Sequence, residues 1–176
     1  MRSVCLHRLV DDMVPDPDPV VFLEPKNVYR SVKESLPEDP QPLSPGQARV
    51  VREGTDLTIV SWGAMLRMCD RYLKESNRGD SIELIDLRSL YPLDRETLAE
   101  SARKTGRVVV VQEAPRAAGL ASEVTALVNE EAFLHLEAPV KRVTGFDTVV
   151  PLARLEEEYR PGVDRLERAL NETLEF

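Results

Sequence analysis

The stretch RVVVVQEAPRAAGLASEV, residues 107–124, decides the fold class of this 176-residue chain. Its four consecutive valines, Val108 to Val111, predict a short strand that is buried on both faces of a sheet. Polar and turn-forming residues follow, and apolar residues then recur at helical spacing from about Ala118 to Leu134. The stretch therefore predicts a strand that leads through a polar turn directly into a helix.

The same alternation continues through most of the chain. Further strands are predicted at residues 47–53, 57–62, 81–87 and 140–145, and further helices at residues 63–77, 95–104 and 163–174. Asp94 is a good N-cap for the second of these helices, and Gly106 fits the position just after its end. This order predicts a three-layer α/β/α domain of Rossmann-like type with a mostly parallel five-stranded sheet.

The first predicted strand, QARVVRE at residues 47–53, differs from the others because its apolar and polar residues alternate. Residues 54–56, Gly-Thr-Asp, then make a tight turn toward the next strand. We therefore expect this strand to lie antiparallel at the edge of the sheet.

The first 46 residues have a different character. Residues 3–10 have a helical pattern, the prolines of DDMVPDPDP end it, and residues 20–23 are a short apolar strand candidate. The proline-rich and charged stretch that follows is typical of a linker. We predict a remnant of a preceding domain at 1–24, a linker at 25–46 and the main domain at 47–176.

Composition excludes several classes of protein. An apolar content of 42% and a mean hydropathy of -0.29 fit a globular chain, and a net charge of -8 argues against nucleic-acid binding. No apolar run approaches the ~20 residues that span a bilayer, and the N-terminus does not resemble a secretory signal, so we expect a cytoplasmic protein. The two cysteines and two histidines lack metal-binding spacing.

Polar residues follow three of the predicted strands. Gln112, Glu113 and Arg116 come after one strand, Arg88 follows another, and Trp62 ends a third. The carboxyl ends of parallel strands are where ligands and partners gather, although such residues also tie loops together. Neither GxGxxG nor GxxxxGK[ST] is present, so no motif supports nucleotide binding.

Five segments in order carry a family resemblance: QARVVREGTDLTIVSWGAM, ELIDLRSLYPLD, KTGRVVVVQEAPRAAGLASEV, EEAFLHLEAPVKRVTGFDT and EEEYRPGVDRLERAL. They resemble the C-terminal half of the beta subunit of the thiamine-diphosphate-dependent 2-oxo acid dehydrogenases, which act on pyruvate, branched-chain 2-oxo acids or acetoin. The resemblance covers residues 18–176. It implies a domain of the transketolase C-terminal type, preceded by the end of a pyrimidine-binding domain.

The resemblance implies a division of labour. An alpha subunit binds the diphosphate and magnesium, and the pyrimidine-binding domain of the beta subunit supplies the activating carboxylate. Alpha and beta form a heterotetramer that decarboxylates a 2-oxo acid and passes the acyl group to a lipoyl acyltransferase core. Because the activating carboxylate lies upstream, no catalytic, cofactor-binding or metal-binding residue transfers to this chain, which we expect to be inactive alone. Glu24 matches the strand-to-linker junction, which favours a structural role.

By the same resemblance the domain has an assembly role. It contacts a second beta subunit and offers a docking surface to the peripheral subunit-binding domain of the acyltransferase. The carboxylate of Phe176 is a candidate for pairing with a basic partner, and the acidic net charge is compatible with such a partner. The candidates for partner contact or strand-end loops are Arg88, Gln112, Glu113, Arg116 and Phe176.

Three positions depart from the family pattern. Gln112 stands where relatives usually have histidine, and it cannot carry a proton at neutral pH. Residues 117–119, Ala-Ala-Gly, offer one glycine where relatives often have two, so we do not expect a tight backbone approach in this loop. Val149 stands where proline is common. These changes indicate a divergent member and do not identify the 2-oxo acid.

Three alternatives stay open. The chain could be a stand-alone, non-catalytic module of the transketolase C-terminal type. It could belong to a different thiamine enzyme such as a transketolase, although residues 113–116 and 140–145 favour the dehydrogenases. The third alternative, a Rossmann-like nucleotide binder, lacks its glycine fingerprint.

Overall fold

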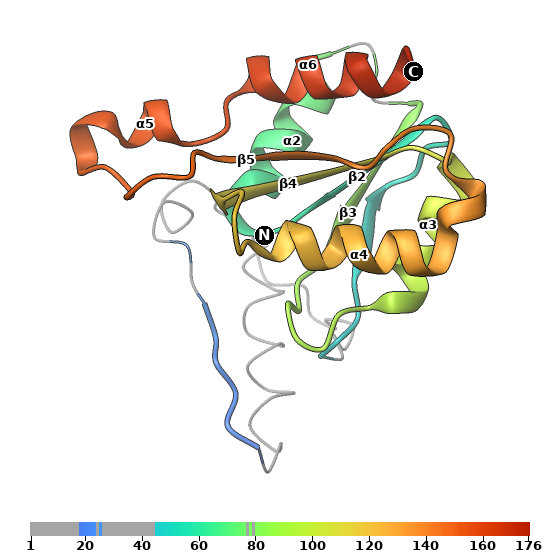
Figure 1. The fold of residues 1–176 in the computed structure, drawn as a ribbon, viewed down its shortest axis with the longest axis horizontal. Coiled ribbons are helices and arrows are strands. Elements are labelled where there is room, and N and C mark those ends of the chain that lie inside the picture. Colours follow the sequence, from blue (N-terminus) through green and yellow to red (C-terminus); the bar gives the residue numbers. More distant parts are fainter. Residues whose placement is uncertain (1–17, 24, 26–44, 77, 79) are drawn as a thin grey trace, which may run out of the picture.

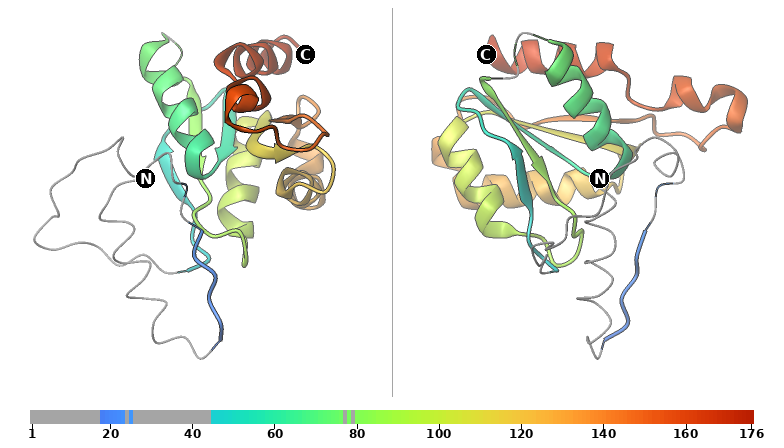
Figure 2. Two further views of the ribbon diagram at one scale, coloured as in Figure 1. Left: turned by 90° about the vertical axis from the view of Figure 1, so that its left-hand side faces the viewer. Right: turned by 180° about the vertical axis from the view of Figure 1, so that it is seen from behind.

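The computed structural model describes residues 18–23, 25, 45–76, 78 and 80–176. Within these residues a single five-stranded sheet has helices on both faces (Figure 1; Figure 2). The elements are β1 Arg49–Arg52, β2 Leu57–Ser61, α2 Gly63–Glu75, β3 Ile82–Asp86, α3 Arg95–Thr105, β4 Val108–Pro115, α4 Leu120–Ala132, the 3-10 turn η2 Phe133–His135, β5 Lys141–Gly145, the 3-10 turn η3 Ala153–Leu155, α5 Glu156–Tyr159 and α6 Val163–Leu174.

The strand order is β1-β3-β2-β4-β5, and every neighbouring pair except β1–β3 is parallel. Helices α2 and α6 cover one face, whereas α3 and α4 cover the other. The three-layer α/β/α prediction, with a mostly parallel sheet and one antiparallel edge strand, is therefore confirmed.

Strand β4 explains why the quoted valines must all be apolar. Val109 and Val111 pack in the layer under α2 and α6, while Val108 and Val110 pack under α3 and α4. All four are buried, as expected for a strand covered on both faces. The strand continues past its predicted end at Val111, because after a register shift Pro115 pairs with Gly145 of β5.

Strand β1 is the antiparallel edge strand, but its neighbour is β3 and not the next strand in the chain. The turn after β1 crosses the amino end of β3, and the N–H groups of Thr55 and Asp56 both donate to the carbonyl oxygen of Ser81, at 3.0 and 2.9 Å. A Cβ atom at Gly54 would lie 2.3 Å from the backbone nitrogen of Glu83. Only glycine lets the chain cross this closely, so the turn delivers β2 to the far side of β3.

Both ends of α3 follow the sequence signals. The Asp94 side chain accepts a hydrogen bond from the N–H of Thr97 at 3.0 Å and one from the N–H of Ala48 at 2.8 Å. Gly106 ends the helix with φ 65°, in the left-handed region. The predicted N-cap and C-terminal glycine are confirmed, and Asp94 also fixes the chain that enters β1.

Two local predictions are wrong. Leu134 was expected on the buried face of α4, but that helix ends at Ala132 and Leu134 is 91% exposed in η2. Val20 to Leu23 were expected to form a strand, yet these residues have no strand pairing and are largely exposed. A strand needs a neighbour to complete its backbone hydrogen bonds, and no described strand lies beside them.

An ion pair between a buried carboxylate and a part-exposed ammonium group joins α3 to the sheet. The Glu83 side chain, which is fully buried in β3, accepts a hydrogen bond from Thr58 Oγ1 at 3.1 Å and pairs with the ammonium group of Lys104. Lys104 also reaches Glu53 at 3.0 Å. This network supplies partners for a carboxylate that burial alone would penalise.

The region before β1 falls mostly outside the described residues, including the predicted helix at 3–10, Glu24 and nearly all of the linker. Pro25 is described, and it lies 3.4 Å from the position of a Cβ atom at Gly63, the first residue of α2. Gly46 donates its N–H to Ser89 Oγ at 2.8 Å, after β3. The boundaries 1–24, 25–46 and 47–176 stay predictions.

Candidate functional site at the carboxyl end of the sheet

The carboxyl ends of β2, β3 and β4 meet at one end of the sheet. In the strand register, Ser61 lies opposite Asp86 on one side and Val111 on the other. The loop that carries Arg88 and the end of β4 at Gln112 therefore lie at the same end of the sheet, on either side of β2. This is the end at which ligands collect in parallel sheets.

Gln112 is 1% exposed, and its side chain ties the end of β4 to the start of α4. Nε2 donates to the carbonyl oxygens of Pro115 at 2.7 Å and Ala114 at 3.3 Å, while Oε1 accepts from the N–H of Ala121 at 2.8 Å. We call Gln112, Pro115, Gly119 and Ala121 the strand-end clamp. Both ends of the Gln112 amide are used inside the clamp, so this side chain closes the turn.

Gly119 provides the space that the clamp requires. A Cβ atom at this position would lie 2.0 Å from Gln112 Nε2 and 2.5 Å from the Pro115 carbonyl oxygen. The expectation that the loop has no tight backbone approach is therefore wrong. One glycine suffices because Ala118 adopts the left-handed φ of 54° and Gly119, at φ -83°, only has to be small.

Asp86 and Arg88 shape the neighbouring loop. Arg88 adopts φ 53°, and its N–H donates to Asp86 Oδ1 at 3.2 Å. Burial raises the pKa of Asp86 above its ordinary value, and this N–H together with the charges of Arg88 and Arg49 partly opposes the shift. The Asp86 carboxylate thus stabilises its own loop, at some cost in desolvation.

Glu113 and Arg116 lie where β4 meets the end of β5. The Glu113 carbonyl oxygen would be 2.6 Å from a Cβ atom at Gly145, so the two backbones approach closely. Arg116 is exposed, and its carbonyl oxygen accepts from Arg142 Nη1 at 3.4 Å. The structure brings Gln112, Glu113 and Arg116 to the same end of the sheet, with Arg116 turned outward to solvent.

Phe176 lies at the other end of the sheet. Lys141, at the start of β5, pairs with Glu172 near the end of α6 at 2.9 Å, and Arg165 donates to the carbonyl oxygen of Thr144 near the end of β5 at 2.5 Å. Helix α6 therefore runs antiparallel to β5 and ends at the amino end of the strands (Figure 1). Phe176 is 75% exposed and does not join the other four candidates.

Sequence reasoning missed the segment between β5 and α6. We call residues 146–158 the arm, which extends beyond the carboxyl end of the sheet and includes η3 and most of α5 (Figure 1; Figure 2). It carries five large apolar side chains that are all exposed: Phe146, Val149, Val150, Leu152 and Leu155. A signal was available, because five such residues within ten positions follow neither a strand nor a helix period.

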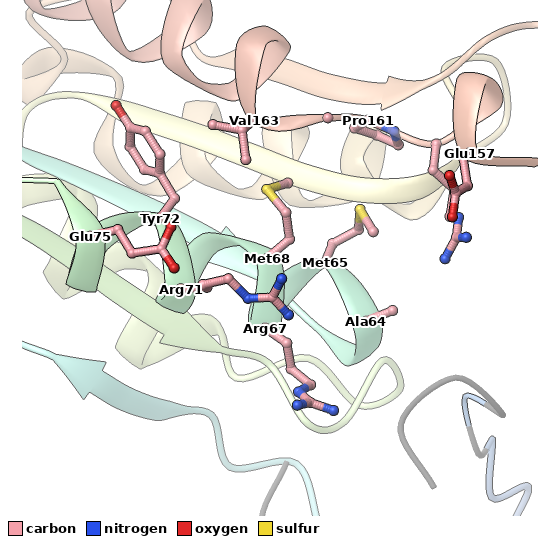
Figure 3. A pocket seen from close by; sticks show the side chains of 12 residues that line it. Ala64, Met65, Arg67, Met68, Arg71, Tyr72, Glu75, Glu157, Pro161 and Val163 are labelled. Atoms are coloured by element: carbon pink, nitrogen blue, oxygen red, sulfur yellow. The ribbon is translucent and has the colours of Figure 1, made fainter. Parts of the chain in front are cut away.

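A groove of about 320 Å³ lies between α2 and the segment that joins α5 to α6. Met65 and Met68 form its apolar floor, and their sulfur-bearing ends point toward Pro161 and Val163 (Figure 3). The remaining lining includes the basic residues Arg67, Arg71 and Arg160 and the acidic residues Glu75 and Glu157.

The described residues offer little direct chemistry. No group of three or more His, Cys, Asp or Glu side chains among them could hold a metal ion. Burial raises the pKa of the Cys69 thiol to about 12, which keeps it protonated and unreactive at neutral pH. Among the helices of the described ranges, none combines the length and apolarity needed to span a bilayer.

Residues 46–166 match the family model described as transketolase, C-terminal domain. The chain belongs to this family. The match begins just before β1 and ends within α6, so this transketolase C-terminal domain contains the strand-end clamp, the groove and the arm.

Relatives of the transketolase C-terminal domain include subunits of two dehydrogenases. It is 47% identical over 152 residues to the pyruvate dehydrogenase E1 component subunit beta of Acholeplasma laidlawii, which covers 86% of this chain and 46% of the relative. It is 50% identical over 137 residues to the mitochondrial 2-oxoisovalerate dehydrogenase subunit beta of Dictyostelium discoideum, which covers 77% and 37%. The chain thus spans less than half the length of these relatives, and its resemblance to beta subunits is confirmed.

A solved structure extends the comparison. A split gene transketolase, described as an inactive beta4 tetramer, matches with a TM-score of 0.67 and 33% identity over 77% of this chain and 44% of that one. The likeness agrees with the observed transketolase-like fold.

Proposed function

We propose that this chain is the C-terminal assembly part of the beta subunit of a 2-oxo acid dehydrogenase. The observation that carries the proposal is the 47% identity to a pyruvate dehydrogenase beta subunit over 86% of the chain. The whole enzyme would carry out the oxidative decarboxylation of a 2-oxo acid with thiamine diphosphate and transfer the acyl group to a lipoyl group. Its substrate stays open, because the relatives include both pyruvate and 2-oxoisovalerate dehydrogenases.

The described residues do not fit a thiamine diphosphate site. Gln112 uses both ends of its amide within the strand-end clamp, and the described part of the chain holds no carboxylate cluster for magnesium. We therefore assign the cofactor and its metal ion to an alpha subunit and to a pyrimidine-binding domain of the beta subunit. In this proposal the chain alone binds neither and has no turnover.

The proposed partners are the alpha subunit, a second beta subunit and the lipoyl acyltransferase core, in a cytoplasmic complex. The exposed apolar side chains of the arm support an assembly role, because surfaces of this kind mark protein contacts. The inactive beta4 tetramer of the split gene transketolase is a precedent for a homomeric assembly within this fold. Exposed Phe176, at the opposite end of the sheet, leaves room for acyltransferase docking away from the arm.

The test is co-purification of the tagged full chain from its source cells, followed by mass spectrometry of the retained proteins. We expect an alpha subunit of a 2-oxo acid dehydrogenase and a lipoyl acyltransferase in stoichiometric amounts. Titration calorimetry with thiamine diphosphate and magnesium should detect no binding to the chain alone. The absence of both partner proteins, or tight cofactor binding by the chain alone, would contradict the proposal.

The alternative is a stand-alone interaction module, which the closed strand-end clamp also accommodates. The intact mass of the native gene product separates the two. A mass well above 19.8 kDa would mean that further domains are joined to this one, as expected for a complete beta subunit. A mass of 19.8 kDa would favour the stand-alone module.

A further inference from the structure

Two methionines of α2 border the groove together. Met65 and Met68 are separated by one helical turn, so they lie on the same face of the helix. Their thioether ends point toward Pro161 and Val163, in the segment that leads from α5 into α6 (Figure 3). The groove between these elements has a volume of about 320 Å³ and is open to solvent, so small polar molecules can enter it.

The two methionines differ in their access to that solvent. Met65 is 6% exposed and belongs to the core under α2 and α6. Met68 is partly buried and packs against that core from its edge. Met68 points toward Val163, which is 43% exposed, whereas Met65 points toward Pro161, which is buried (Figure 3). We therefore expect a dissolved reagent to reach the sulfur atom of Met68 well before that of Met65.

Within the described residues, Met68 carries the sulfur atom that is most open to oxidation. Cys69, the next residue, is fully buried, and burial raises the pKa of its thiol to about 12. It therefore stays a thiol at neutral pH, and a thiol reacts far more slowly than a thiolate. A thioether has no proton to lose, so its conversion to the sulfoxide depends on access to the oxidant.

We propose that Met68 is a reversible oxidation site for hydroperoxides, and that its sulfoxide loosens the segment between α5 and α6. In the forward step the sulfur atom attacks one oxygen of hydrogen peroxide, the O–O bond breaks and an S–O bond forms. The proton of the attacked hydroxyl passes to the other oxygen, which leaves as water. The sulfur loses two electrons and the peroxide gains them. In the reverse step two thiols reduce the sulfoxide to the thioether and become a disulfide, with release of water.

The packing around Met68 explains why one added oxygen would matter. An S–O group is strongly polar and needs hydrogen-bond donors, which the apolar side chains of Met65 and Val163 cannot supply. To reach water, the sulfoxide must move apart from Val163, the first residue of α6. The buried Tyr159 anchors the end of α5 just before this segment, and an added Cβ atom at Gly145 would lie 2.7 Å from its ring. A displacement at Val163 would therefore also shift the end of the arm.

The opposite end of α2 should be unaffected. Tyr72 Oη donates to the Glu167 carboxylate at 3.3 Å, and Arg78 donates to the side chain of Asn171. These hydrogen bonds join α6 to the end of α2 and to the loop that follows it. We therefore expect local loosening of residues 156–163 and no loss of the fold.

The experiment is a graded oxidation of the full 176-residue chain with hydrogen peroxide, followed by peptide mass spectrometry. Met68 should gain one oxygen at least ~10-fold faster than Met65. Once Met68 is fully oxidised, the amides of residues 156–163 should exchange with deuterium at least ~3-fold faster than in the untreated chain, and the melting temperature should fall by about 3 °C. Treatment with methionine sulfoxide reductases for both sulfoxide epimers, together with a dithiol, should restore both values.

Met68→Leu is the matched control, because leucine keeps the approximate apolar volume and has no sulfur atom. This variant still carries Met1, Met13 and Met65, so any effect of their oxidation appears in it as well. After the same treatment its exchange rates and melting temperature should stay unchanged. Met68→Gln places a polar group at the same position without any oxidant and should reproduce the faster exchange of residues 156–163.

Three results would overturn the proposal. The first is oxidation of Met65 as fast as that of Met68, and the second is Met68 oxidation that leaves the exchange of residues 156–163 unchanged. The third is an equal loss of stability in the treated Met68→Leu chain. The oxidation site is independent of the proposed beta-subunit function, which co-purification with an alpha subunit tests separately.

Discussion

The strand-end clamp and the arm lie at the same end of the sheet, but the clamp buries polar groups whereas the arm exposes apolar ones. The clamp buries polar groups and gives each of them a partner within the chain, as the hydrogen bonds of Gln112 show. The arm exposes apolar groups such as Leu152, which is 90% exposed to solvent. We infer that the clamp contributes to the stability of the single chain, whereas the arm contributes to association.

The strongest way to break the clamp is Gly119→Ala. The added Cβ atom would collide with Gln112 and with the Pro115 carbonyl oxygen, so we expect a loss of about 3 kcal/mol in the free energy of unfolding, measured by urea titration. Gly162→Ala is the matched control, because no atom lies within 4 Å of its added Cβ. It should cost under about 1 kcal/mol. Equal losses in the two variants would mean that the clamp is not tightly packed.

Removing the polar group of Gln112 has the next largest effect. Gln112→Leu keeps the approximate size but leaves the buried Ala121 N–H and the partly buried Pro115 carbonyl oxygen without this partner, so stability should fall by about 2 kcal/mol. Gln47→Leu, on an exposed glutamine, is the control and should change stability by less than about 0.5 kcal/mol. A neutral result for Gln112→Leu would show that the turn closes without its hydrogen bonds.

A smaller effect, which depends on pH, is expected at Asp86, at the carboxyl end of β3. Because burial raises its folded pKa, Asp86 favours folding most below its unfolded pKa, near 3.8, and this contribution is lost as pH rises through the folded pKa. Asp86→Asn cannot ionise. Its stability relative to the wild type should therefore increase across that interval and then level off, in unfolding curves recorded from pH 3 to 8. A difference that stays constant with pH would argue against the raised pKa.

The smallest effect on stability is expected in the arm. Leu152→Ala should change the free energy of unfolding by less than about 0.5 kcal/mol at protein concentrations where the chain is monomeric. Leu166→Ala, on a fully buried leucine of α6, should cost about 3 kcal/mol in the same assay. Comparable losses would mean that the arm packs against its own chain.

The sequence predicts the fold well wherever a local rule determines the structure. The N-cap at Asp94 and the left-handed Gly106 depend on neighbouring residues, and a run of four valines is a local sign of a strand that is covered on both faces. The neighbour of β1 was missed because it depends on the crossing at Gly54, a contact with Ser81 and Glu83 that lies far away in the sequence. Predictions were least successful where tertiary contacts override local patterns.

The sequence placed four of the candidate residues at strand ends, but it did not predict which groups their side chains contact. The strand-end location of Gln112 and Arg88 follows from the parallel order of the strands. The sequence could not indicate that the Gln112 amide forms hydrogen bonds with the backbone of Ala121 and Pro115. The folded turn between β4 and α4 brings those backbone groups to the side chain. The groove was equally hidden, since α2 and residues 157–163 meet only in the folded chain.

The ion pair between buried Glu83 and part-exposed Lys104 bears on how the chain avoids misalignment of its strands. Ile82 and Leu84 pack under α2 and α6, whereas Glu83 points to the opposite face, where α3 supplies Lys104. A slip of β3 by one residue would turn Glu83 into the apolar layer of Cys69 and Leu73, away from Lys104. A charge that is buried without its partner is strongly destabilising. This one glutamate therefore raises the energy of any pairing in which β3 is shifted by an odd number of residues.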